Sequence, residues 1–196
     1  METVEVAIKN MMEDKDSIRK RILTRRNAMS DMDCMEKSAR ILKKLDKTDI
    51  FLSAYKVAIY ASYANEVITY PLINRAKFLD KGVAFPYIVS EEKCEMIFKY
   101  VLNISGLKPG KYHILAPEEK AVTMEQPDLI IMPLVAFDEN RNRIGYGKGY
   151  YDRYLKAHPN CKTIALAYED QKVERIPADD NDFRPQMIIT EEKIYE

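Results

Sequence analysis

The residues with the clearest chemical potential lie in the segment 143–153, which reads RIGYGKGYYDR. Three glycines alternate there with larger side chains. Because glycine has no Cβ atom, the backbone N–H groups beside it can approach an anion closely, and the chain can adopt positive φ angles. Arg143 and Lys148 add positive charge, and a following helix would add the partial positive charge of its N-terminus. The pattern fits a phosphate-binding loop and also a purely structural turn, and it matches neither a Walker A loop nor a GxGxxG fingerprint.

Carboxylates near this segment are candidates for a metal site. Asp152 stands one turn into the helix expected after the glycines, and the segment 177–185, PADDNDFRP, is acidic. Mg²⁺ usually takes one or two carboxylates together with phosphate oxygens, so a carboxylate beside bound phosphates is a typical ligand. The plainer alternatives are a first-turn aspartate that favours the helix dipole and a solvated acidic loop.

A second cationic feature lies near the N-terminus. Lys15, Arg19 and Arg26 fall within about 40° of each other on a helical wheel, next to the apolar face that begins at Ile18. Cations at the edge of a buried face can reach into a cleft. An ordinary solvated face with apolar stems would show the same pattern.

Other residues allow two interpretations each. Glu66 follows directly on an expected strand, which is a position for substrate contact or for a loop carboxylate without a role. Tyr150 and Tyr151 fit either core aromatics or a surface for a flat ligand. His113 and His158 have no metal-ligand spacing, and no Ser–His–Asp or Cys–His arrangement is visible in the sequence.

The composition is that of an ordinary globular chain. Among 196 residues, 31 Lys and Arg balance 31 Asp and Glu, so the formal net charge is zero. Zero net charge argues against nucleic acid or an anionic membrane as the main partner. The three cysteines form no CxxC pair, which argues against a disulfide framework or a thiolate zinc site. No apolar run approaches the roughly 18 residues of a membrane span and no secretory signal opens the sequence, so we expect a cytoplasmic protein.

An alternation of strands and helices positions these residues. Apolar runs bounded by turn residues predict strands, and apolar residues at helical spacing predict helices. The predicted strands are 56–62, 82–88, 95–102, 128–138, 162–168 and 187–190, and the predicted helices are 14–30, 32–45, 69–80 and 150–158. This order indicates an α/β fold, a single-domain three-layer α/β/α architecture with a mostly parallel central sheet. Ligands bind beyond the carboxyl ends of the strands in such sheets, which is where the glycine segment falls.

Some details of this prediction are specific. We expect Thr69 to cap the helix 69–80 and the apolar run 128–138 to form one central strand buried on both faces. The glycines and prolines of 103–127 predict a long loop. We expect a single domain over 14–196, preceded by a mobile leader over 1–13.

In combination, these segments resemble the 5-formyltetrahydrofolate cyclo-ligase family, also called methenyltetrahydrofolate synthetases. The similar segments follow the family's order: KDSIR at 15–19, YASYANEV at 60–67, PDLIIMPLVAFD at 127–138, RIGYGKGYYDR at 143–153, IALAYEDQ at 164–171 and NDFRPQMIIT at 181–190. The glycine–YYDR segment is the most specific of them. Many members have glycine where Asn142 and Lys148 stand, and some have histidine where Asn181 stands.

The resemblance implies that 5-formyltetrahydrofolate and ATP are converted to 5,10-methenyltetrahydrofolate, ADP and phosphate with Mg²⁺. A formyl amide carbon is a poor electrophile, and its oxygen is a poor leaving group. Transfer of the γ-phosphoryl group to that oxygen makes the carbon more electrophilic and the oxygen a better leaving group. The N10 amine then attacks the carbon and closes the ring. The protein's part in such a reaction is positioning and charge neutralisation.

Carried over position by position, the resemblance implies four sets of residues. The ATP-binding set is Lys15, Arg19, Arg143, Gly145, Tyr146, Gly147, Lys148, Gly149, Tyr150 and Tyr151. The folate-binding set is Glu66, Tyr146, Gly147, Lys148, Gly149 and Tyr150. The metal ligands are Asp152 and Asp182, and the catalytic residues are Lys148, Tyr151 and Arg153.

Two other classes of protein fit the same residues. A nucleotide-binding regulator would bind ATP without turnover, and a sugar-phosphate isomerase of related architecture would use a phosphate cradle without ATP or Mg²⁺. The acids Asp152 and Asp182 and the cations Lys15 and Arg19 favour the ligase over both. We expect a monomer whose partner is the folate substrate, with no nucleic acid and no membrane.

Overall fold

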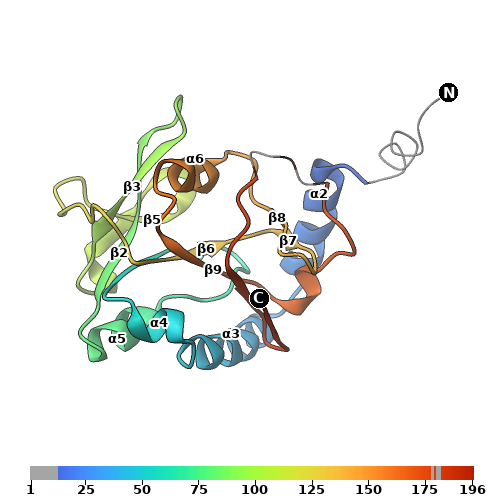
Figure 1. Cartoon of the computed structure of the whole chain (residues 1–196), viewed down its shortest axis with the longest axis horizontal. Coiled ribbons are helices and arrows are strands. Elements are labelled where there is room, and N and C mark those ends of the chain that lie inside the picture. Colours follow the sequence, from blue (N-terminus) through green and yellow to red (C-terminus); the bar gives the residue numbers. More distant parts are fainter. Residues whose placement is uncertain (1–12, 178, 180–181) are drawn as a thin grey trace.

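The fold is built on a seven-stranded sheet, seen in the computed structural model of Figure 1, which describes residues 13–177, 179 and 182–196. Its strand order is β11-β10-β9-β6-β1-β2-β3. The five strands from β10 to β2 are parallel, and the edge strands β11 and β3 are antiparallel to their neighbours. The predicted α/β fold with a mostly parallel sheet is therefore confirmed. The leader up to residue 12 and Asn181 lie outside the described residues.

The elements follow the predicted order with several changes of length. The strands of the large sheet are β1 (Lys56–Ile59), β2 (Gly82–Ser90), β3 (Glu95–Tyr100), β6 (Leu129–Pro133), β9 (Lys162–Leu166), β10 (Met187–Ile189) and β11 (Ile194–Tyr195). Two small ribbons pair β4 (Leu107–Pro109) with β5 (Leu115–Pro117) and β7 (Ala136–Phe137) with β8 (Arg143–Ile144). The helices are α2 (Lys15–Asn27), α3 (Asp31–Leu45), α4 (Asp49–Ser53), α5 (Pro71–Phe78) and α6 (Tyr150–Ala157), with the single 3₁₀ turns η1 (Ile104–Gly106), η2 (Lys111–His113) and η3 (Glu169–Gln171).

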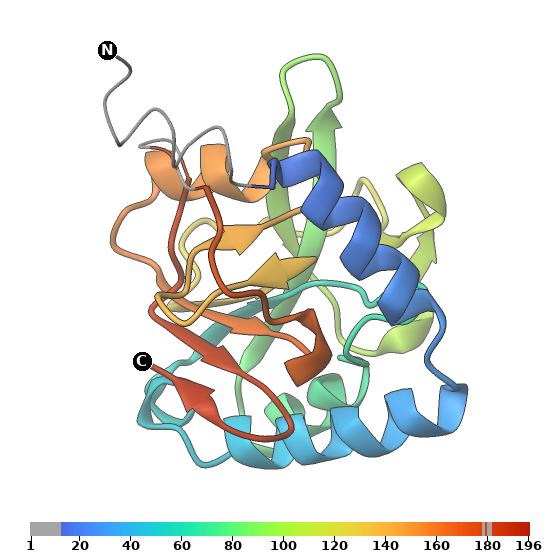
Figure 2. The same ribbon diagram turned by 90° about the vertical axis from the view of Figure 1, so that its right-hand side faces the viewer.

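Helices cover both faces of the sheet because the buried strands are apolar on both faces. Alternate residues of β1 show this, since Val57 and Ile59 join a cluster with Ile41 and Leu45 of α3, whereas Ala58 joins the cluster of α6. Figure 2 shows α3 along one side of the sheet and α6 on the other. The expected three layers are present. None of the helices that the structure describes combines the length and the hydropathy that spanning a bilayer requires.

Helix α2 packs on the end of this assembly rather than on the sheet. Its buried residues Ile18 and Ile22 form a third cluster with Ala136 and Ile144 of the β7–β8 ribbon and with Ile176. Asp14 caps the helix, and its carboxylate accepts from the backbone N–H groups of residues 16 and 17. This packing places one side of α2 against the segment that carries the glycines.

The expected strand 128–138 was wrong in its second half. The sheet strand ends at Pro133, and the chain then turns out of the sheet into the β7–β8 ribbon. The side-chain amide of Gln171 donates to the carbonyl groups of Leu134 and Val135 at 3.0 and 2.9 Å, so this bend keeps its hydrogen bonds without a neighbouring strand. Both halves of 128–138 are apolar because both are buried, so the composition gave no sign of the bend between them.

Other boundaries differ for local reasons. Strand β1 ends at Ile59, and helix α5 begins at Pro71 with Tyr70 as its N-cap. Thr69 is not the cap, because its hydroxyl donates to the carbonyl of Tyr60 at 2.7 Å. Strand β2 continues past Pro86, since beyond residue 84 it pairs with β3 and no longer with β1. The predicted loop 103–127 contains the β4–β5 ribbon.

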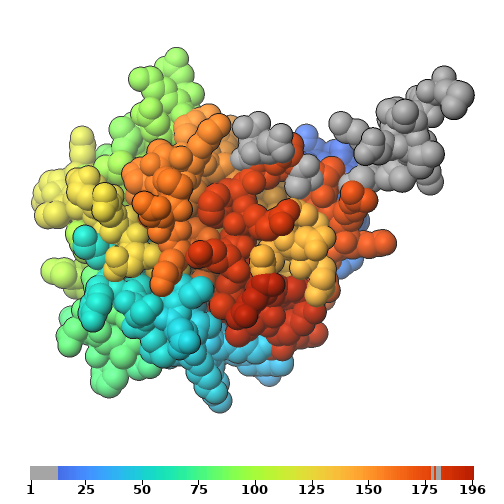
Figure 3. All heavy atoms as spheres, in the orientation of Figure 1, coloured from blue at the N-terminus to red at the C-terminus, as the bar shows by residue number. Residues whose placement is uncertain are grey.

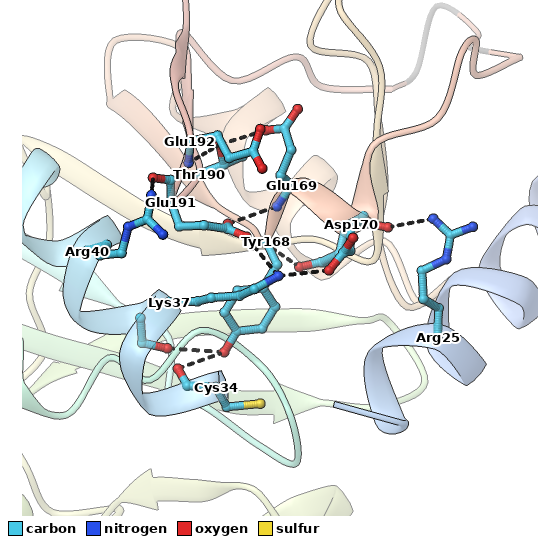
Figure 4. A network of polar contacts seen from close by, with 12 residues as sticks. Arg25, Cys34, Lys37, Arg40, Tyr168, Glu169, Asp170, Thr190, Glu191 and Glu192 are labelled. Carbon is cyan, nitrogen blue, oxygen red and sulfur yellow. Dashed lines mark hydrogen bonds and ion pairs between the residues drawn. The ribbon is translucent and has the colours of Figure 1, made fainter. Parts of the chain in front are cut away.

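A polar network fastens the C-terminal strands to α3 (Figure 4). Lys37 pairs with Asp170 and Glu191 at 2.8 and 2.9 Å. The buried Tyr168 directs its hydroxyl toward α3 and donates to the backbone carbonyl of Glu66 at 3.0 Å. On the face in Figure 3 the C-terminal part of the chain, in red, lies against α6, in orange. These contacts fix the loops that follow β1 and β9.

Candidate active site

A cleft of about 970 Å³ opens at the carboxyl ends of the parallel strands. Tyr60 and Ala61, which follow β1, and Pro133, which ends β6, all line it. The cleft therefore lies beyond the strand ends, where the glycine segment was expected to fall. The volume reaches the upper end of the usual range for ligand sites, about 300–1,000 Å³, so the cleft has room for more than one small ligand.

The glycine segment forms one wall of this cleft. Gly147 and Gly149 have φ angles of 90° and 69°, a region that costs a residue with a Cβ atom free energy. Gly149 is the N-cap of α6. Because glycine has no side chain, it supplies no oxygen to accept from the first backbone N–H groups of this helix. Backbone N–H groups in this arrangement suit an anion. Lys148 lies exposed between the two glycines and also lines the cleft.

Helix α2 forms a cationic wall directly beside the glycine segment. Lys15 pairs with Asp182 at 2.5 Å and with Asp179 at 3.0 Å. Arg19 donates through Nε to the carbonyl of Gly145 at 2.8 Å, which fastens the glycine segment to the helix. Lys15 and Arg19 both line the cleft. The structure thus brings together the two cationic features that were 126 residues apart in the sequence.

The two predicted metal ligands lie in the same cleft. Asp152 in the first turn of α6 accepts from the Arg143 guanidinium and from the backbone N–H of Phe183, the latter at 3.1 Å. The second contact places the segment that carries Asp182 beside Asp152. Burial lowers the pKa of Arg143, and the adjacent carboxylate of Asp152 opposes that shift. No group of three or more His, Cys, Asp or Glu side chains that could hold a metal ion occurs among residues 13–177, 179 and 182–196, so a metal here would need oxygens from a ligand or from water.

This donor set fits Mg²⁺, a cation that prefers oxygen ligands. Mg²⁺ is commonly held by one or two carboxylates, with phosphate and water oxygens completing the octahedron. Asp152 and Asp182 supply the two carboxylates, and Arg143 and Lys15 neutralise them in the structure as it stands. The buried Nε of Arg143 has no hydrogen-bond partner among the described residues, so this side chain retains a donor for a ligand oxygen.

Glu66 lies at the floor of the cleft and is 6% exposed. Its carboxylate accepts from the hydroxyl of Tyr146 and, at 2.9 Å, from the backbone N–H of Tyr63. Burial raises the pKa of Glu66, and these two hydrogen bonds and the charge of Arg26 work against that rise. A buried carboxylate with both oxygens already accepting can still accept further N–H groups, because each oxygen has two lone pairs.

The remaining predicted residues divide into two groups. Tyr150 and Tyr151 line the cleft, and the buried hydroxyl of Tyr151 has no hydrogen-bond partner among the described residues. Arg153 points away from the cleft, and its guanidinium donates to the backbone carbonyls of Lys93 and Cys94 in the turn between β2 and β3. The structure therefore gives Arg153 a bracing contact and does not place it among the cleft residues.

One wall of the cleft was missed from the sequence. Tyr87 and Ile88 of β2 and residues 108–112 and 114–118 of the β4–β5 ribbon line it. The available signal was the length of the segment 103–127, because loops of more than about 12–15 residues in a compact domain are commonly functional.

Comparisons with known proteins agree with this geometry. The family model described as the 5-formyltetrahydrofolate cyclo-ligase family matches residues 11–191. The 5-formyltetrahydrofolate cyclo-ligase of Mus musculus is 28% identical over 195 residues, covering 91% of this chain and 94% of the mouse protein. That of Escherichia coli K12 is 28% identical over 89% of this chain and 99% of its own.

A solved structure extends the similarity to three dimensions. The 5,10-methenyltetrahydrofolate synthetase of Aquifex aeolicus superposes with a TM-score of 0.82 at 29% identity, covering 93% of this chain and 92% of its own. That of Mycoplasma pneumoniae gives a TM-score of 0.73 at 28% identity over 91% and 99% of the two chains. The chain is therefore an enzyme of the ligase class and belongs to the 5-formyltetrahydrofolate cyclo-ligase family.

Proposed function

We propose that this enzyme converts 5-formyltetrahydrofolate and ATP to 5,10-methenyltetrahydrofolate, ADP and phosphate in a Mg²⁺-dependent reaction. The observation that supports this most directly is the convergence on one cleft of a glycine turn, the cations of α2, two carboxylates and the buried Glu66. A phosphate-handling end and a polar acceptor for a second ligand are both needed for this chemistry. Membership of the family supplies the substrate class.

The phosphate-handling end consists of the turn and α2. We assign the triphosphate to the N–H groups of 145–149, with Lys15 and Arg19 as the flanking cations. Both side chains are only partly exposed, at 28% and 20%, so their charges act in a region of reduced solvent screening. We assign contact with the transferred phosphoryl group to Lys148, which lies exposed at the centre of the turn and lines the cleft.

The carboxylates Asp152 and Asp182 would hold Mg²⁺ on the same phosphates. When bound, the ion neutralises charge on the phosphate oxygens and orients the γ-phosphoryl group for in-line transfer. Arg143 and Lys15, which now pair with these carboxylates, would turn toward the phosphate oxygens.

The folate end is assigned to Glu66 and Tyr146. A pterin ring presents adjacent N–H groups, and a carboxylate is the acceptor best suited to them. Burial of Glu66 strengthens such bonds because few water molecules compete. The formyl group would then lie between Glu66 and the glycine turn, within reach of the phosphates.

The chemistry proceeds in three steps on the substrate. The formyl oxygen attacks the γ-phosphorus of ATP and ADP leaves, which makes the formyl carbon electrophilic. The N10 amine then attacks that carbon and loses its proton. The C–O bond breaks with release of phosphate, and the five-membered methenyl ring carries the positive charge. The buried Tyr151 hydroxyl and the Nε of Arg143 are donors available to the developing negative oxygens.

The test is absorbance in the methenyl-folate band. Purified protein is mixed with 5-formyltetrahydrofolate and MgATP, beside mixtures that lack ATP or Mg²⁺. We expect the band to grow in the complete mixture alone. A flat trace from folded protein that binds ATP would favour a regulator without catalysis. If the folded protein binds neither ATP nor the folate, the proposed reaction is wrong for this chain. The monomeric state and the cytoplasmic location stay predictions.

A further inference from the structure

Three side chains from distant parts of the chain form a hydrogen-bonded series beside the cleft. Arg26 of α2 donates through an Nη atom to the Tyr146 hydroxyl at 2.8 Å, and that hydroxyl in turn donates to the Glu66 carboxylate. The guanidinium carbon also lies 5.6 Å from the centroid of the Tyr146 ring. Tyr146 and Glu66 line the cleft, and Arg26 stands behind them outside it.

Burial makes the position of Arg26 costly unless it serves a contact. The residue is 3% exposed, and its Nε has no hydrogen-bond partner among the described residues. A buried guanidinium requires a nearby negative charge, and no ion pair of Arg26 occurs in the part of the chain that the structure describes. The nearby negative charge is that of Glu66, which the Tyr146 hydroxyl connects to Arg26 by two hydrogen bonds. Serial hydrogen bonds between opposite charges polarise one another, which strengthens both bonds.

The backbone around Glu66 is tied to the same end of α2. The side-chain amide of Asn65 donates to the carbonyls of Arg26 and Met29 at 3.2 and 2.9 Å. The Arg26 carbonyl also accepts from the backbone N–H of Met29, so the Asn65 amide adds a tie to this helix end and does not replace a missing bond. These bonds fasten the loop that carries Glu66 to the end of the helix that carries Arg26, and Tyr146 links both to the glycine turn.

We propose that Arg26 is a positioning residue that acts through the Tyr146 hydroxyl to hold the Glu66 carboxylate toward the folate substrate. The inference rests on the proposed function, since it takes Glu66 as the folate ligand. Arg26 itself touches neither substrate. Because Tyr146 stands between Gly145 and Gly147, the series also links the folate end to the turn assigned to the phosphates.

Equilibrium binding of 5-formyltetrahydrofolate tests this, measured without ATP for wild type, Arg26→Met, Tyr146→Phe and the double variant. We expect each single variant to bind about tenfold more weakly, the usual effect of one charge-assisted hydrogen bond. The double variant should be no weaker than either single one, because the two residues act in series. Arg26→Lys, which keeps the charge and one donor, should recover part of the affinity.

Arg25→Met is the matched control. Arg25 is the neighbouring residue on α2, is exposed, and donates to the backbone carbonyl of Asp170, as Figure 4 shows. Its loss should leave folate affinity and turnover unchanged. Thermal melting checks each variant for folding, and if Arg26→Met does not fold, Tyr146→Phe and Arg26→Lys carry the test.

The outcomes separate this inference from the proposed function. A wild type that turns over, with Arg26→Met and Tyr146→Phe binding folate as wild type does, overturns the positioning role alone. A double variant about a hundredfold weaker than wild type also overturns it, because the two residues would then act independently. A wild type that neither binds nor converts the folate overturns both.

Discussion

The substitution Asp152→Asn tests the negative charge that pairs with the buried Arg143 guanidinium in the candidate site. The substitution keeps an oxygen that can accept from the Phe183 N–H and removes the negative charge beside the Arg143 guanidinium. The Arg143 side chain is 4% exposed and that of Asp152 is 30% exposed. Removing one partner of a fully buried pair costs about 3–5 kcal/mol, and the partial exposure of Asp152 reduces this to about 2 kcal/mol. For a chain of this length that corresponds to a fall in Tm of roughly 4–8 °C.

Thermal melting in the absence and presence of Mg²⁺ with a non-hydrolysable ATP analogue is the assay. The ligand pair at about a hundred times its Kd should stabilise the wild type by roughly 2.7 kcal/mol. In Asp152→Asn the part of that gain that depends on Mg²⁺ should disappear. The double variant Arg143→Met, Asp152→Asn should be more stable than Asp152→Asn alone, because no unpaired charge is left buried.

Two results would refute this reasoning. A melting curve of Asp152→Asn equal to that of wild type would mean that solvent, and not Asp152, compensates Arg143. An unchanged Mg²⁺-dependent gain would remove Asp152 from the metal site.

Four further predictions follow from single contacts. Ile22→Ala, at a position with 0% exposure, should lower the free energy of unfolding by about 2–5 kcal/mol in urea titrations without a change in m-value. Gly147→Ala, at φ 90°, should raise the KM for ATP and cost about 1–2 kcal/mol of stability; an unaltered KM would separate the turn from the phosphates. Burial raises the pKa of Glu66 above its ordinary 4.5, so ionisation of Glu66 lowers stability as the pH rises from 4.5 through the folded-state pKa; the free energy of unfolding of Glu66→Gln relative to that of wild type should increase over this range, and a pH-independent difference would contradict the raised pKa. Arg153→Met should leave kcat nearly unchanged while it increases hydrogen exchange in the β2–β3 turn, and a hundredfold loss of kcat would restore a catalytic role.

The order of elements could be predicted because hydrophobic periodicity reflects burial. Strand 162–168 and helix 150–158 were placed within a few residues of β9 and α6 for that reason. The break after Pro133 was beyond the same signal, because β6 and β7 are both buried, one in the sheet and one under α2. Which partner buries an apolar residue is a property of tertiary structure and leaves no local pattern.

The site was predictable where its residues share a segment or a helical face. Lys15 and Arg19 could be assigned to one face, and 145–149 to one turn. The contact of Arg26 with Tyr146 and the wall formed by the β4–β5 ribbon depend on packing between distant segments. Arg153 shows the limit of a motif for placing side chains, since one helical position after Asp152 rotates its side chain by about 100°, toward the turn between β2 and β3.

The separate packing of α2 has a consequence for how the site is assembled. Its buried residues Ile18 and Ile22 pack in a small cluster of their own, outside the two large clusters on the faces of the sheet. Because this cluster is small, we expect α2 to open at a lower free energy than the sheet, and Lys15, Arg19 and Arg26 would leave the site with it. The empty enzyme would then exchange between complete and incomplete sites while its sheet stays folded. Ligands that bridge α2 and the glycine turn would select the complete form. The extent to which substrates slow hydrogen exchange in α2 would then measure how much binding free energy is used to hold α2 closed.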